Sequence, residues 1–166
     1  MRHADKPTVQ EYIDVAAPVE RVWALVSDIA LSVGVSDELV SVEWTSGTGD
    51  APCAGRTFVG TNSNQYFGRW QTTATVIECD EPTAFAWAVG DVDDPNSSWR
   101  YTLTPVPDGT RVTQAVQLGT GPSGLTIAIE RMPDKEERIV ARRLDEFRTS
   151  LRRNLETIKQ RAESAG

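Results

Sequence analysis

Side chains that could move protons or bind a metal ion are few in this sequence. Its one histidine, His3, lies in a polar N-terminal stretch, which argues against a histidine-based triad and against a histidine metal site. The two cysteines, Cys53 and Cys79, do not have the spacing of a zinc site and are expected as free thiols. The sequence therefore predicts no metal ion and no cofactor.

Two further motifs suggest ligands at first sight, but each is better explained as a turn. The segment 119–124 fits the pattern G-x-G-x-x-G of dinucleotide sites, yet no strand follows the helix expected after it. The acidic run at Asp91, Asp93 and Asp94 lacks the length and the glycine placement of a calcium loop. We interpret the glycines as the exit from the last strand and the aspartates as a solvated turn.

The remaining groups that could do chemistry near a pocket mouth are carboxylates, arginines and one tyrosine. They are Glu43, Arg69, Glu78, Arg100, Tyr101 and Glu130. Successive side chains of a strand point to opposite faces, so Arg100 lies opposite Tyr101, and Glu43 lies opposite Trp44. This alternation predicts that Arg100 and Glu43 face solvent. No residue is assigned a catalytic role.

The elements that position these groups follow from the periodicity of apolar residues. Residues 9–15 predict a strand, and a helix over 19–28 follows Pro18, whose fixed φ suits a helix start. A second short helix is expected over 29–35. Beyond it the period changes to two, and turn residues recur about every ten positions. Strands are predicted over residues 39–45, 56–62, 70–79, 84–89, 98–106 and 110–118.

The C-terminal part of the chain predicts helices. Residues 123–132 favour a short helix that ends before Pro133. Beyond it, apolar residues recur every three or four positions and form the stripe of a long amphipathic helix. Its members are Val140, Leu144, Phe147, Leu151, Leu155, Ile158 and Ala162. Such a stripe must be buried, and the predicted sheet offers the large apolar surface for it, so the fold class is α+β.

This order of elements resembles the helix-grip fold of the START-like, or SRPBCC, superfamily. The local sequence is also similar to the bacterial polyketide cyclase/dehydrase and lipid-transport family. The similar stretches are residues 17–23, 42–44, 55–62, 70–82 and 85–87. The resemblance implies one START-like domain over residues 1–166, with 1–7 as a flexible tail. In it a seven-stranded antiparallel sheet, with two short helices after the first strand, wraps around a long C-terminal helix and leaves an apolar cavity.

Alternation along the strands indicates which side chains would line that cavity. Val40, Val42 and Trp44 share one face of their strand, for example. Such rows of side chains on one face of a strand could equally belong to a packed core. Polar residues on otherwise apolar faces favour a pocket, in which Asn62 and Gln114 would orient the ligand by hydrogen bonds. The predicted ligand-binding residues are Phe58, Asn62, Trp70, Thr72, Phe85, Trp87, Trp99, Tyr101, Gln114, Val116, Leu144, Phe147 and Leu151.

Three functions remain open at this point. The leading hypothesis is binding or transport of a small hydrophobic ligand in the cavity, without catalysis. The alternatives are a cyclase or dehydratase that uses the same cavity, and a protein-interaction module like the co-chaperone and toxin-like members of the superfamily. The formal net charge of −7 argues against a nucleic-acid partner. Apolar runs are too short for membrane insertion, and we expect a cytoplasmic monomer or homodimer.

Overall fold

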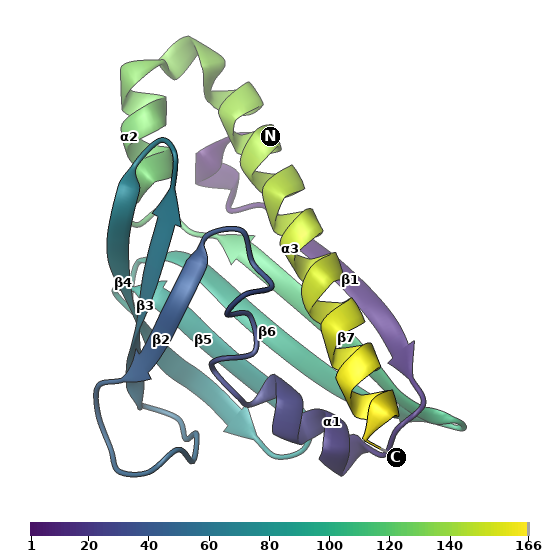
Figure 1. Cartoon of the computed structure of the whole chain (residues 1–166). Coiled ribbons are helices and arrows are strands. Elements are labelled where there is room, and N and C mark those ends of the chain that lie inside the picture. Colours follow the sequence, from purple (N-terminus) through teal and green to yellow (C-terminus); the bar gives the residue numbers. More distant parts are fainter. Residues whose placement is uncertain (166) are drawn as a thin grey trace.

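A curved antiparallel sheet of seven strands grips one long helix in the computed structural model, which describes residues 1–165 (Figure 1). The strand order is β1-β7-β6-β5-β4-β3-β2, so β2 to β7 form a meander of chain neighbours and β1 pairs with β7. The predicted helix-grip architecture is confirmed. The strands are β1 Thr8–Val15, β2 Leu39–Trp44, β3 Thr57–Asn64, β4 Gly68–Asp80, β5 Ala84–Gly90, β6 Pro95–Val106 and β7 Gly109–Leu118.

Three α-helices accompany the sheet, namely α1 Val19–Val26, α2 Gly124–Arg131 and α3 Glu136–Ser164. Pro18 caps α1 as predicted, and the Ser123 hydroxyl accepts a hydrogen bond from the Leu125 amide at the start of α2. The 29 residues of α3 bury the predicted apolar stripe against the β1–β7 side of the sheet and against α1 (Figure 1). Within residues 1–165, no helix is both long enough and apolar enough to cross a membrane.

The prediction of a second short helix over residues 29–35 is wrong. This segment instead forms consecutive turns between α1 and β2, with amide-to-carbonyl bonds from Leu31 to Asp28 and from Val33 to Ala30. Gly34 has a φ of 79°, which a right-handed helix does not contain. Buried Leu31 anchors the turns in the core, so tertiary packing decides the conformation. We call residues 27–38 the connecting segment.

A β-bulge in β2 changes which of its side chains face the helix. The register of β2 against β3 shifts between Leu39 and Ser41, so Val40 is 44% exposed, although alternation predicts it on the inner face. Leu39 turns inward and lies against Gly60. Val42 and Trp44, beyond the bulge, keep their predicted face and are partly buried.

The first seven residues lie against the start of α3 and the end of β7. Arg2 forms a salt bridge of 2.9 Å with Glu136, and this hydrogen-bonded guanidinium lowers the pKa of the Glu136 carboxyl. The Pro7 carbonyl accepts a hydrogen bond from the Leu118 amide. The flexibility expected for residues 1–7 stays a prediction.

Candidate functional site

A continuous row of aromatic side chains crosses the concave face of the sheet from β2 to α3. The ring of Trp44 packs edge-on against Phe58 with 5.5 Å between centroids, and Phe58 packs against Trp87 at 6.4 Å. Trp87 stacks on Trp99 at 6.1 Å, and Trp99 packs edge-on against Phe147 of α3 at 5.2 Å. We call these five residues the aromatic row, and it links the sheet to the helix that the sheet grips.

Most of the predicted site residues gather in two clusters of buried side chains that the aromatic row joins. Because α3 lies along the β1–β7 side of the sheet, Trp87 and Trp99 are only partly covered and remain half-buried. The first cluster contains Phe58, Phe85 and Tyr101, with Trp87 packed against it. The second contains Val116, Leu144, Phe147 and Leu151, with Trp99 packed against it.

Four predicted site residues lie outside both clusters, namely Gln114 and three residues on the part of β3 and β4 nearest to their hairpin. Asn62 is paired with Trp70 across these strands, and Thr72 is paired with Gly60. All three side chains are half-buried, and the Asn62 amide donates a long hydrogen bond of 3.5 Å to the Thr72 hydroxyl. They extend the concave face away from the helix, beside Phe67, whose ring packs edge-on against Trp70.

A chain of hydrogen-bonded polar side chains, of which Asn154 and Gln114 are buried, crosses the space between the connecting segment, α3 and the sheet. Ser32 donates a hydrogen bond of 3.0 Å from its hydroxyl to Asn154 Oδ1, and Asn154 Nδ2 donates one of 3.2 Å to Gln114 Oε1. Gln114 lies directly opposite Tyr101 on the neighbouring strand, so both side chains project to the same face. Within residues 1–165, neither Gln114 Nε2 nor the Tyr101 hydroxyl has a hydrogen-bond partner.

These two unpartnered groups are enclosed in the protein interior. Tyr101 is 2% exposed and Gln114 is 0% exposed. Burial raises the pKa of the Tyr101 hydroxyl well above its usual range, and the neighbouring Gln114 amide offsets part of that effect. Tyr101 therefore stays a neutral donor at physiological pH. A buried polar group without a partner costs about 1–3 kcal/mol, so each of these atoms requires an explanation.

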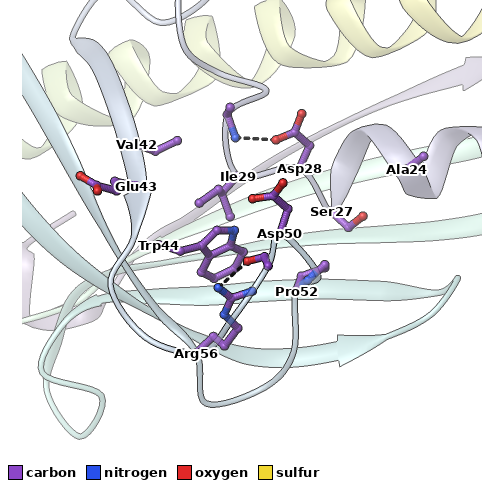
Figure 2. Close-up of a pocket in the computed structure, with 13 residues that line it drawn as sticks. Ala24, Ser27, Asp28, Ile29, Val42, Glu43, Trp44, Asp50, Pro52 and Arg56 are labelled. Carbon is purple, nitrogen blue, oxygen red and sulfur yellow. Dashed lines mark hydrogen bonds between the residues drawn. The ribbon is translucent and has the colours of Figure 1, made fainter.

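An open hollow of about 780 Å³ lies at the Trp44 end of the aromatic row (Figure 2). It is enclosed by the end of α1, the first turn of the connecting segment, β2 and the β2–β3 loop. Trp44 lines it and belongs to the aromatic row as well, so the hollow adjoins the interior. The other lining side chains that the figure labels are Ala24, Ser27, Asp28, Ile29, Val42, Glu43, Asp50, Pro52 and Arg56.

Arg56 shapes the wall of this hollow, because the β2–β3 loop folds around its guanidinium. Its three nitrogens donate hydrogen bonds to the backbone carbonyls of Ser46 at 2.8 Å, Gly49 at 2.9 Å and Ala51 at 2.5 Å. The guanidinium carbon lies 4.0 Å from the ring centroid of Trp44. Arg56 is only 6% exposed, and the three carbonyl dipoles and the face of the Trp44 ring offset the cost of burying its charge.

Sequence reasoning missed Arg56 and Asn154. Asn154 interrupts the apolar stripe of α3 between Leu151 and Leu155, and a polar residue at such a position is a visible signal for a buried hydrogen bond. The burial of Arg56 depends on the path of a loop, which periodicity does not describe. The hollow itself carries no predicted site residue.

Arg100 and Glu43 face solvent, as the alternation along their strands predicts. Arg100 is exposed and forms a salt bridge with Glu78, and exposed Glu43 lines the hollow. Both cysteines are free thiols. Within residues 1–165, no strand follows the helix after the glycine pattern, and no group of three His, Cys, Asp or Glu side chains converges as a metal site would require.

Comparisons with known proteins agree with this architecture. The profile of the family described as polyketide cyclase / dehydrase and lipid transport matches residues 6–163. A polyketide cyclase-like protein of Corynebacterium glutamicum is 30% identical, with 95% of this chain and 92% of that chain covered and a TM-score of 0.66. No curated protein matches the chain in sequence.

Two further solved structures share the fold at low identity. The di-domain ARO/CYC protein StfQ from the steffimycin biosynthetic pathway is 14% identical, with 98% of this chain covered and a TM-score of 0.72; this chain spans 54% of its length. The protein Ara h 8.0201 is also 14% identical, with 95% of this chain and 98% of that chain covered and a TM-score of 0.59. At this identity they support the fold alone.

Proposed function

This chain belongs to the polyketide cyclase / dehydrase and lipid transport family, and from that membership we propose that it binds a small hydrophobic molecule between the concave face of its sheet and α3. The ligand would lie against Trp87 and Trp99 and enter past Trp44 from the open hollow. The two fold neighbours support the fold that this proposal requires.

The observation that carries the proposal is the half-buried stack of Trp87 and Trp99. Indole rings carry large apolar areas, so any part of these rings that stays accessible is apolar surface that a ligand could cover. Here the two rings meet between the two buried clusters and keep part of their surface accessible. A ligand that covers about 200 Å² of apolar surface would contribute roughly 5 kcal/mol before association costs.

The polar groups of the interior favour binding over catalysis. Among residues 1–165, the buried polar side chains are Ser27, Arg56, Ser97, Thr110, Gln114 and Asn154, to which Tyr101 adds its hydroxyl. Hydroxyls and carboxamides orient a ligand by hydrogen bonds, but they do not exchange protons near neutral pH. Transport or storage therefore fits this interior better than an acid–base reaction does.

The proposal is tested by titrating the protein with fluorene, a rigid apolar probe, and following tryptophan emission. We expect a saturable change in wild-type emission that the double variant Trp87→Phe/Trp99→Phe loses. Trp23→Phe is the matched control, because Trp23 is a buried residue of α1 that contacts Phe85 and does not belong to the aromatic row. This control should retain the response.

A second measurement does not depend on the choice of probe. Native mass spectrometry of protein purified from its own host should show an additional mass that organic extraction removes. An unchanged emission over a panel of hydrophobic probes, together with a single bare mass and normally folded variants, would contradict the proposal.

A further inference from the structure

We infer that Tyr101 and Gln114 together bind one hydrogen-bond acceptor atom of the ligand, so that the preferred ligands are apolar molecules that carry a carbonyl oxygen. This inference deepens the proposed function and rests on it. It assigns a specific polar contact to a site whose other surroundings are apolar.

The hydrogen-bond pattern defines which atoms are left for a ligand. The Gln114 oxygen already accepts a hydrogen bond from Asn154, and the Asn154 oxygen accepts one from Ser32. Because of these two hydrogen bonds, the Gln114 amide nitrogen points away from α3. The Tyr101 hydroxyl is the second free group, on the residue directly opposite in β6. Two enclosed donors on adjacent strands thus lack an acceptor within residues 1–165.

A carbonyl oxygen is the acceptor that suits two donors. It has two lone pairs and no hydrogen, so it accepts from a hydroxyl and an amide without leaving a donor of its own unpaired. An alcohol would bring one more hydrogen. It could donate this hydrogen to the Tyr101 oxygen, but the Tyr101 hydrogen would then lack an acceptor beside apolar neighbours such as Val112 and Val116 on the same face of β7. Tyr101 also contacts Trp87, with 6.1 Å between ring centroids, which places the donor pair beside the aromatic row.

Fluorene and fluorenone test the inference as a matched pair, since they share one ring system and differ by a methylene and a carbonyl. Dissociation constants are measured by calorimetry for wild type, Tyr101→Phe and the control Tyr12→Phe, an exposed residue of β1. We expect Tyr101→Phe to lower the preference for fluorenone over fluorene roughly tenfold and to change fluorene binding less than about twofold. Tyr12→Phe should change neither constant.

Infrared spectroscopy of bound fluorenone supplies a readout apart from affinity. Hydrogen bonds weaken the carbonyl bond, so its stretching frequency should be lower in wild type than in Tyr101→Phe, and Gln114→Met should shift it in the same direction as Tyr101→Phe. Equal preference and equal frequency in wild type and Tyr101→Phe would overturn the inference alone, because the Gln114 amide nitrogen would then donate to the Tyr101 oxygen and close the hydrogen-bond chain internally. Failure of both probes to bind would overturn the proposed function and the inference with it.

Discussion

Trp87 and Trp99 face each other across β5 and β6 with their ring planes only 2° from parallel and their centroids 6.1 Å apart. Each indole belongs to the edge of a different buried cluster, so their contact is where the sheet side and the helix side of the interior meet. The two side chains should therefore be energetically coupled.

We predict a coupling free energy of about 0.5–1.5 kcal/mol between these two rings, in addition to the area that each buries. It is measured by a double-mutant cycle of Trp87→Leu, Trp99→Leu and the double variant in urea unfolding. Phe67 and Trp70, an aromatic pair at the more exposed β3–β4 hairpin, form the comparison cycle and should couple more weakly. Additive single effects at Trp87 and Trp99 would contradict this.

Replacing Arg56 should destabilise the protein strongly. Arg56→Met removes three hydrogen bonds to backbone carbonyls and the contact with Trp44, so we expect a loss of about 2–5 kcal/mol in the free energy of unfolding. Arg56→Lys should restore little of it, because one ammonium cannot reproduce the planar fork of a guanidinium. Exposed Arg69→Met, the matched control, should stay within about 0.5 kcal/mol of wild type.

Alkaline pH should destabilise the protein through Tyr101. Its pKa is raised by burial in the folded state, so above about pH 10 the unfolded chain loses a proton that the folded chain retains. Stability therefore falls as pH rises, and Tyr101 contributes up to about 1.4 kcal/mol per pH unit. Urea unfolding between about pH 9 and pH 11 should show a shallower slope for Tyr101→Phe than for wild type. Tyr12→Phe should keep the wild-type slope, and identical slopes in all three proteins would refute the prediction.

The glycines that leave β7 should be intolerant of any side chain. A Cβ at Gly119 would collide with the Pro95 carbonyl, and one at Gly121 with the Asp94 carbonyl. Backbone atoms cannot give way as a flexible side chain does, so we expect Gly119→Ala and Gly121→Ala to cost about 2–4 kcal/mol each in thermal or urea unfolding. Gly124→Ala meets only the ring of exposed Phe67 and should change stability by no more than about 1 kcal/mol.

The regular part of the fold was predictable from the sequence for simple reasons. A period of two between frequent turn signals predicts a meander, and a six-turn apolar stripe predicts a helix that needs a sheet to cover it. The same alternation placed Trp87, Trp99, Tyr101 and Gln114 on the inner faces of their strands, whereas the pairing of Trp87 with Trp99 and of Tyr101 with Gln114 is set by the register of the sheet.

The features that were not predicted depend on local irregularities, tertiary packing and loop conformation, which the periodicity of the sequence does not describe. The bulge in β2 adds one residue and turns Val40 outward, and the turns after α1 follow from the docking of Leu31 in the core rather than from local helix propensity. The burial of Arg56 and the open hollow beside it arise only when the β2–β3 loop closes.

The way that loop closes has a practical consequence for redesign. Its shape is specified by one cation that binds backbone carbonyls, which every residue type possesses, and Gly47 is constrained because its φ is 76° and a Cβ there would lie 2.6 Å from Arg56 Nε. The side chains at positions such as Thr48 and Asp50 can therefore be varied freely. A library at these positions would vary the rim of the hollow while the scaffold beneath it stays constant.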